Sequence, residues 1–230
     1  MAYYPAMLDL RDRLVLVVGG GRVAARKVAS LLEAGARVRL VSPELAAETA
    51  ELAEGERVEY RRGGFSPSDL EGVCLVISAT DDPELNREVA ERAGERGLFV
   101  NVVDVPRLCS FIVPAVVRRG DLLLAVSTGG ASPAVARRLR RELEAAYGPA
   151  WGPYLRLMAE LRRRITARGR PAQENRPLFW ALADSELYQR VAAGDGPGVD
   201  RVLESVLGPG WSLARLGWGP EDLRPRGDER

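Results

Sequence analysis

The feature that most constrains the fold is a short apolar run followed by three glycines. Residues 14–18 read Leu-Val-Leu-Val-Val, and residues 19–24 read Gly-Gly-Gly-Arg-Val-Ala. A glycine turn between a strand and a helix is typical of dinucleotide binding, with Gly19 making the tight turn. Gly21 would let the backbone approach a pyrophosphate, and Ala24 would let the helix pack closely on the strand. Glycine-rich turns also serve as plain connections, so the surrounding sequence must decide.

The sequence around the turn favours the dinucleotide interpretation. Apolar residues at Val28, Leu31 and Leu32 have helical spacing, and the pattern stops at Gly35 before a second apolar run at 38–41. Further strands are predicted at 58–60, 73–78 and 97–103, and a helix is predicted from Pro83 to about Arg96. Alternating strands and helices predict an α/β fold with a parallel sheet, so residues 1–110 are expected to form a Rossmann-like domain.

A different pattern begins after residue 110. Apolar segments at 111–117 and 122–127 predict an antiparallel hairpin, and Ser132-Pro133 begins a helix that runs to Tyr147. We expect residues 111–148 to form a small α+β dimerisation segment and residues 149–207 to form a helical domain. Residues 208–230 are rich in glycine, proline and charge, and are expected to be a loosely packed or disordered tail.

Composition excludes several kinds of chemistry. A formal net charge of +1 gives no general reason to expect nucleic acid or an anionic membrane as a partner. No apolar stretch reaches the roughly 20 residues that span a bilayer, and residues 1–10 lack a signal-peptide layout, so we expect a cytoplasmic protein. The chain has no histidine, and Lys27 is its only lysine. Proton chemistry therefore falls to carboxylates or tyrosine, and no resident metal is expected.

Ligands of open parallel sheets bind at the carboxyl ends of the strands, so the strand tips indicate the candidate cofactor contacts. Those contacts are Gly19, Gly21, Arg22, Val23, Ala24, Ser42, Pro43, Glu44, Thr80 and Asn101. Glu44 either reaches the ribose hydroxyls or is only a first-turn helix residue. Because no arginine is present at this second strand tip, where a 2′-phosphate would need one, the sequence favours NAD over NADP.

Asp104 is the first candidate for a catalytic residue. It follows the last predicted strand of the domain, and a carboxylate that faces a cofactor cleft can act as a general base. The alternative is that its side chain only caps the turn at Val105-Pro106.

A second glycine turn precedes the helix that begins at Ser132. Its residues Ser127, Thr128, Gly129 and Gly130 offer hydroxyl and N–H groups suited to an anion such as a substrate carboxylate. The alternative is a flexible connection between strand and helix.

Four motifs together resemble one family. They are residues 17–27, Val-Ser-Pro-Glu at 41–44, Asn-Val-Val-Asp at 101–104 with Cys109-Ser110-Phe111 after it, and Ser-Thr-Gly-Gly-Ala-Ser-Pro at 127–133. In this order and spacing the chain resembles, over about residues 5–205, the precorrin-2 dehydrogenase and sirohydrochlorin ferrochelatase family, also found as a module of siroheme synthase. The resemblance implies NAD-dependent oxidation of precorrin-2 to sirohydrochlorin, with insertion of Fe²⁺ in some members. It also implies a homodimer joined through the segment after the Rossmann domain.

The resemblance also implies roles for individual residues. The family's catalytic aspartate falls on Asp104, where it would accept a proton from the tetrapyrrole substrate. Thr128 occupies a hydroxyl position that some members phosphorylate, usually as serine, and we predict no regulation there. The NAD contacts fall on Gly21, Arg22, Val23, Pro43 and Glu44. A function of another class, a non-catalytic NAD-sensing Rossmann module, is the alternative, although such modules usually carry an acid where this chain has Ser42.

Overall fold

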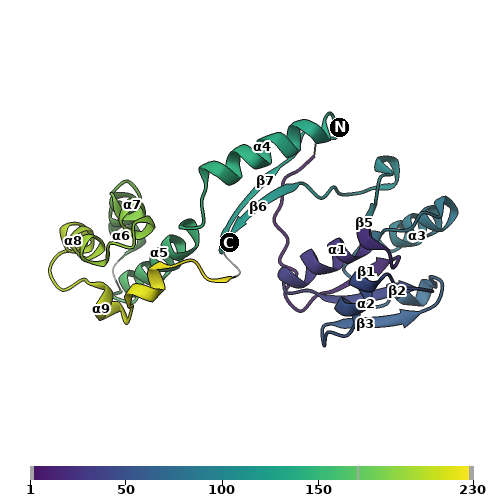
Figure 1. Ribbon diagram of the computed structural model, residues 1–230, viewed down its shortest axis with the longest axis horizontal. Coiled ribbons are helices and arrows are strands. Elements are labelled where there is room, and N and C mark those ends of the chain that lie inside the picture. The colour runs from purple at the N-terminus through teal and green to yellow at the C-terminus, as the bar shows by residue number, and fades with distance from the viewer. Residues whose placement is uncertain (1–2, 170, 228–230) are drawn as a thin grey trace. The chain divides into compact units, whose positions relative to one another are not determined.

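The apolar runs of the N-terminal half form a five-stranded parallel sheet in the computed structural model, which describes residues 3–169 and 171–227 (Figure 1). Its strands are β1 (Leu14–Val18), β2 (Arg37–Ser42), β3 (Val58–Arg62), β4 (Leu75–Ser78) and β5 (Phe99–Val102), in the order β3-β2-β1-β4-β5. Val18 pairs with Val41 on one side and with Ser78 on the other, and Ser78 pairs with Val102. The carboxyl ends of these neighbouring strands therefore align at one edge of the sheet.

Helices cover both faces of this sheet. They are α1 (Arg22–Glu33), α2 (Ala47–Ala53) and α3 (Pro83–Glu95), with short 3-10 turns at Pro67–Leu70 and Pro106–Leu108. Val15 and Val17 of β1 pack with Ala24 of α1, whereas Leu16 packs with Val89 of α3 on the other face. Alternate residues of β1 thus enter opposite cores, which explains its unbroken apolar sequence. The predicted parallel α/β sheet is confirmed.

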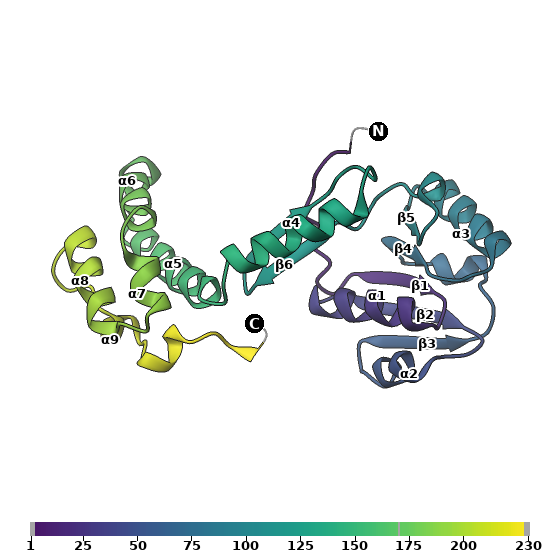
Figure 2. The same ribbon diagram turned by 45° about the horizontal axis from the view of Figure 1, so that its top comes forward.

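The chain divides into two units, Met1–Val113 and Pro114–Arg230, and the second begins with an antiparallel hairpin. Its strands are β6 (Ala115–Arg119) and β7 (Leu122–Val126), and α4 (Pro133–Ala146) packs along them (Figure 2). The predicted first strand was placed too early, because Arg118 and Arg119 belong to β6. A two-residue turn suffices here, since Gly120 adopts a φ of 58°.

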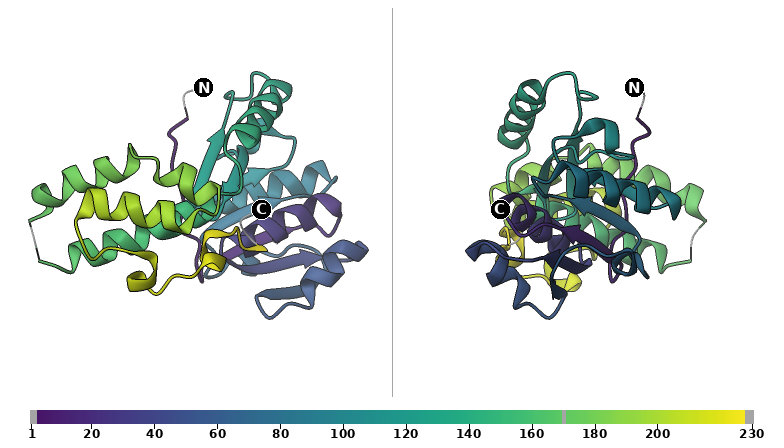
Figure 3. Two further views of the ribbon diagram at one scale, coloured as in Figure 1. Left: turned by 60° about the vertical axis from the view of Figure 1, so that its left-hand side comes forward. Right: turned by 90° about the vertical axis from the view of Figure 1, so that its right-hand side faces the viewer.

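The rest of the second unit is helical, as the sequence predicts for residues up to 207 (Figure 3). Its elements are α5 (Trp151–Thr166), α6 (Ala172–Ala183), α7 (Leu187–Ala192), α8 (Gly196–Leu207), α9 (Leu213–Leu216) and a 3-10 turn at Pro220–Leu223. Leu157, Leu161 and Ile165 of α5 are buried against Leu182 of α6 and Leu203 of α8. None of the described helices is both long enough and apolar enough to cross a membrane.

The expectation of a loosely packed tail is wrong for residues 208–227. Trp211, Leu213, Leu216 and Leu223 are buried in the core of the helical elements. Arg164 of α5 holds the segment by donating hydrogen bonds of 2.9 and 3.1 Å to the carbonyl oxygens of residues 215 and 216. Four large apolar side chains and these long-range hydrogen bonds outweigh the glycine and proline content. Residues 228–230 lie outside the described part of the chain.

Candidate functional site

A cleft of about 780 Å³ lies at the aligned carboxyl ends of the strands in the first unit. It is lined by residues 18–23, 41–43, 63–65, 79–83, 85–86 and 103–105. Every strand of the sheet contributes residues at or after its end, with both 79–83 and 85–86 following β4, so the topology gathers loops that are distant in sequence. This is the edge at which open parallel sheets bind ligands.

The glycine turn after β1 forms one wall of the cleft. Gly19 adopts a φ of +117°, and a Cβ there would overlap the carbonyl oxygen of Ala79. A Cβ on Gly20 would overlap the carbonyl oxygen of Glu44, a constraint that the sequence pattern did not reveal. Gly21 differs from both, because no heavy atom lies within 4 Å of a Cβ placed on it. Of these three glycines, Gly21 is therefore the one that borders open space into which a ligand can come.

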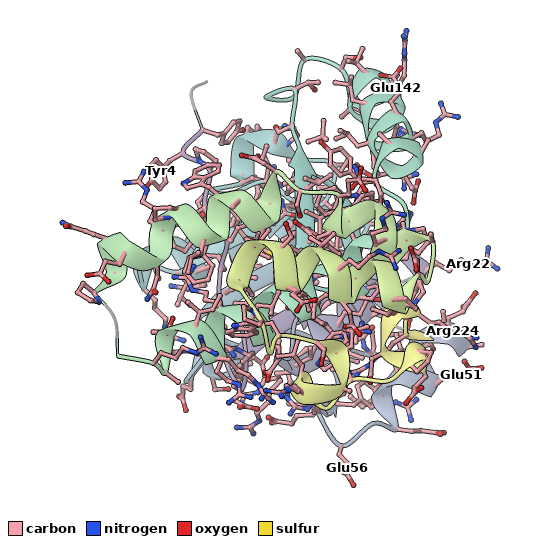
Figure 4. All side chains as sticks on the ribbon, turned by 90° about the vertical axis from the view of Figure 1, so that its left-hand side faces the viewer. Tyr4, Arg22, Glu51, Glu56, Glu142 and Arg224 are labelled. Carbon is pink, nitrogen blue, oxygen red and sulfur yellow. The ribbon has the colours of Figure 1, made fainter. Side chains whose placement is uncertain are left out.

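The N-terminus of α1 is left open toward a ligand. Gly21 is its N-cap residue and makes no side-chain cap, and the first turn contains no acidic residue. The Arg22 side chain projects from the ribbon and pairs with Glu48 of α2 at 3.2 Å, with both side chains exposed (Figure 4). Free N–H groups and the positive end of the helix dipole suit a pyrophosphate. Ala24 is fully buried beneath this turn and lets α1 pack on the sheet, as predicted.

The tip of β2 is held in place by its own polar groups. Ser42 is 5% exposed, and its hydroxyl donates a hydrogen bond of 2.6 Å to the carbonyl oxygen of Glu44. Ser42 and Pro43 line the cleft, whereas Glu44 is not among the lining residues. The sequence indicated no arginine at this tip, but Arg62 of β3 donates a hydrogen bond of 3.2 Å to the carbonyl oxygen of Pro43. Strand pairing, which the sequence pattern does not show, brings it there.

The tip of β4 is a braced turn that lines the cleft with Thr80. The amide of Asn86 donates to the Thr80 carbonyl oxygen at 3.0 Å, and the hydroxyl of Ser78 donates to Asn86 at 2.6 Å. Asp82 caps α3 by accepting a hydrogen bond of 2.8 Å from the N–H of residue 84. Asn86 also lines the cleft, although it was not among the predicted contacts. Its position in the first turn of the predicted helix, directly after a strand tip, could have indicated it.

Asp104 presents an exposed carboxylate at the tip of β5. Its φ is +60°, a left-handed conformation that aspartate tolerates better than most residues. In residues 3–169 and 171–227 its carboxylate has no hydrogen bond or ion pair, so the alternative of a cap on the Val105-Pro106 turn has no support. The carboxylate lies in the same cleft as the open end of α1, with its oxygens free to accept a proton.

Asn101 and Cys109 do not line the cleft, but their side chains hold the loop that carries Asp104. Asn101 is buried, does not line the cleft, and donates a hydrogen bond of 3.0 Å to the carbonyl oxygen of Phe111. The Cys109 sulfur accepts from the N–H of Val102 at 3.2 Å and lies 3.4 Å from the carbonyl oxygen of Val105. Val102 and Val105, which flank the segment that carries Asp104, are thus both held by the Cys109 side chain.

The second predicted turn lies in the second unit. The hydroxyl of Ser127 accepts from the N–H of Gly129 at 3.1 Å, and the hydroxyl of Thr128 bonds both the N–H and the carbonyl oxygen of Ser132 at 3.1 Å. Gly129 and Gly130 have φ values of +62° and +88°. The Thr128 hydroxyl is therefore used within the turn both as donor and as acceptor, whereas the Ser127 hydroxyl only accepts and can still donate to an anion beside the backbone N–H groups.

The fold and the cleft define a Rossmann protein with a dinucleotide site, and comparison with known proteins agrees. A family model described as "Putative NAD(P)-binding" matches residues 6–115, and one described as "Sirohaem biosynthesis protein central" matches residues 119–146. The solved structure of SirC, a precorrin-2 dehydrogenase, is similar with a TM-score of 0.72 and 28% identity, covering 89% of this chain and 99% of that one.

Siroheme synthases are similar over nearly the whole chain. Those of Methylobacillus flagellatus and Nitrosococcus oceani are 41% and 38% identical over 229 and 228 residues, 96% of this chain in each case. The alignments cover 49% and 48% of those proteins, so the chain spans about half the length of the curated relatives it matches. The chain is thus similar to SirC over nearly all of that protein and to about half of each siroheme synthase, and its first unit is an NAD-binding domain, as the sequence predicts.

Proposed function

We propose that this chain is an NAD-dependent dehydrogenase that oxidises precorrin-2 to sirohydrochlorin in siroheme biosynthesis. The observation that carries the proposal is one cleft with the uncapped N-terminus of α1 on one side and the unpaired Asp104 carboxylate on the other. Similarity to SirC and to siroheme synthases supports the choice of substrate.

The cleft residues fit a bound dinucleotide. The N–H groups that follow Gly21 are free of side-chain caps and would hold the pyrophosphate, with Arg22 and Val23 beside it. Pro43 lines the cleft at the β2 tip and would face the adenosine ribose, with Glu44 reaching it only if the loop moves. Thr80 would face the nicotinamide half from the β4 tip. When bound, NAD⁺ supplies the hydride acceptor.

Asp104 would act as the general base. Oxidation of the tetrapyrrole removes a hydride with its two electrons and also a proton, and the Asp104 carboxylate takes that proton. Its backbone is fixed in the left-handed conformation by neighbouring hydrogen bonds, from the N–H of Val103 to Ser78 at 2.9 Å and from the N–H of Val105 to Val102 at 3.2 Å. Because the base is already oriented, little free energy is lost in reorienting it during the reaction.

The second unit would bind part of the substrate and would form the interface of a homodimer. Backbone N–H groups of the turn formed by Ser127, Thr128, Gly129 and Gly130 would bind a carboxylate of the substrate. The helix α4 has no buried residue, and its Val135 and Leu139 are 46% and 40% exposed. An amphipathic helix whose apolar residues remain exposed in the single chain supports a homodimer formed through α4 and the hairpin.

The test is turnover of anaerobically prepared precorrin-2 with NAD⁺, followed by tetrapyrrole absorbance. We expect the wild type to form sirohydrochlorin and Asp104→Asn to lose at least about 100-fold in kcat, the contribution typical of a positioned base. Calorimetry should show that the Kd for NAD⁺ is unchanged. Asp12→Asn is the matched control, because Asp12 is also exposed and has a φ of 58°, but lies outside the cleft.

Two other outcomes are informative. NAD⁺ binding without turnover by the wild type would contradict the dehydrogenase and favour a non-catalytic NAD-sensing module. Adding Fe²⁺ after the oxidation is complete tests the second family activity, because an iron-dependent change in absorbance reports insertion of the metal into sirohydrochlorin.

A further inference from the structure

The only lysine of the chain occupies an unusual place on α1. Lys27 lies one helical turn after Val23, which lines the cleft, so the two residues share one side of the helix. That side flanks the stripe of Ala24 and Val28, which packs on the sheet together with Val103, the neighbour of Asp104. Long helical side chains run back toward the helix N-terminus, which brings the Lys27 amine toward the level of the strand tips.

The charges around this amine are few. Lys27 is half-buried, and among the described residues it forms no ion pair. Burial lowers the pKa of Lys27, Arg26 on the same helix lowers it further, and the Asp104 carboxylate acts in the opposite direction. Asp104 thus opposes the lowering of the Lys27 pKa, and the Asp104 carboxylate itself has no direct partner in the described part of the chain.

We propose that Lys27 is a positioning residue for Asp104: its ammonium group faces the carboxylate from α1 and keeps it directed into the cleft. An ammonium group attracts a carboxylate even when the two groups are not in contact. Because the two groups stay beyond ion-pair distance, the Asp104 oxygens remain open to the substrate. The catalytic consequence rests on the dehydrogenase function proposed above, whereas the pairing of charges does not.

The pairing can be measured without turnover, because one lysine gives one side-chain amine signal. The rate at which acetic anhydride modifies Lys27 is followed against pH, with peptide mass spectrometry separating Lys27 from the N-terminal amine. We expect Asp104→Asn to lower the apparent pKa of Lys27, because it removes a negative charge. Arg26→Gln is the matched control and should raise it, because it removes a positive charge. An unchanged pKa in Asp104→Asn overturns the proposal.

Turnover tests the consequence. Lys27→Met should lower kcat at least about tenfold while the KM for NAD⁺ changes less than about twofold, and Lys27→Arg should restore most of the rate. The midpoint of thermal unfolding should not fall in Lys27→Met, because an unbranched apolar side chain replaces a half-buried charge. A loss of stability in Lys27→Met, or a failure of Lys27→Arg to restore the rate, would assign Lys27 a structural role instead. If the wild type shows no turnover, the proposed function fails and the labelling result still decides the pairing.

Discussion

The chain contains two glycine turns that open helices, and they are built in different ways. At the first, before α1, side chains on Gly19 or Gly20 would overlap carbonyl oxygens of residues 79 and 44. At the second, before α4, no heavy atom lies within 4 Å of a Cβ on Gly129 or Gly130. Long-range packing requires glycine in the first turn, whereas only the local backbone conformation favours it in the second.

The helix ends that follow these turns differ in the same sense. The N-terminus of α1 has no side-chain cap, whereas Ser132 caps α4 by accepting a hydrogen bond of 3.3 Å from the N–H of Val135. Hydroxyls at positions 127 and 128 take up further hydrogen bonds of the second turn. The first glycine turn thus leaves the backbone N–H donors of α1 open to a ligand. The second turn uses some of its own N–H donors in hydrogen bonds to the hydroxyls of Ser127, Thr128 and Ser132.

The largest effect should come from Gly20→Ala. The added Cβ meets a backbone carbonyl oxygen, which cannot move without shifting the β2 tip, so we expect a loss of about 3 kcal/mol or more in the free energy of unfolding. Urea denaturation measures it, and Gly21→Ala in the neighbouring open position is the control. A loss below about 0.5 kcal/mol would show that the turn is as tolerant as the second one.

Gly21→Ala should separate ligand binding from folding. Its φ of −80° suits alanine, so the free energy of unfolding should stay the same or rise by about 0.5 kcal/mol. The Cβ would instead occupy the space of the pyrophosphate, so the Kd for NAD⁺ should increase about tenfold or more in calorimetry. An unchanged Kd would mean that the pyrophosphate does not approach Gly21.

The sheet could be predicted because its signals are local. The run at residues 14–18 became β1 with the predicted bounds, and the helices after Asp82 and Ser132 begin at the prolines that the sequence indicated. Residues 208–227 could not be predicted in the same way, because Trp211 and Leu223 are held by α5 side chains that lie far away in sequence. Composition alone therefore gave the wrong result there.

The candidate cleft could be predicted only in part. Strand tips located Gly21, Thr80 and Asp104 correctly as lining residues, because the edge of a parallel sheet follows from strand order. Arg62 and the left-handed conformation of Asp104 could not be foreseen, since the first depends on the pairing of β2 with β3 and the second on the closure of a loop. The segment 63–65 follows β3 just as the other tips follow their strands, and that rule would have found it.

Gly129→Ala should lower the free energy of unfolding by less than Gly20→Ala does. A left-handed φ of +62° costs alanine about 1 kcal/mol, but no neighbouring atom opposes the side chain. Gly129→Asn is the matched variant, because asparagine adopts this conformation more readily and should recover most of the loss. Urea denaturation measures both, and a loss as large as that of Gly20→Ala would show that the second turn is also fixed by packing.

Ser132→Ala should have an effect no larger than that of Gly129→Ala, and it tests the difference between the two helix ends directly. Removing this cap leaves the N–H of Val135 without its acceptor, which should cost about 1 kcal/mol in the free energy of unfolding. The Kd for NAD⁺ should not change, since the open α1 end belongs to the other unit. If the loss in stability were absent, the Ser132 cap would contribute nothing to α4, and the two helix ends would not differ in this respect.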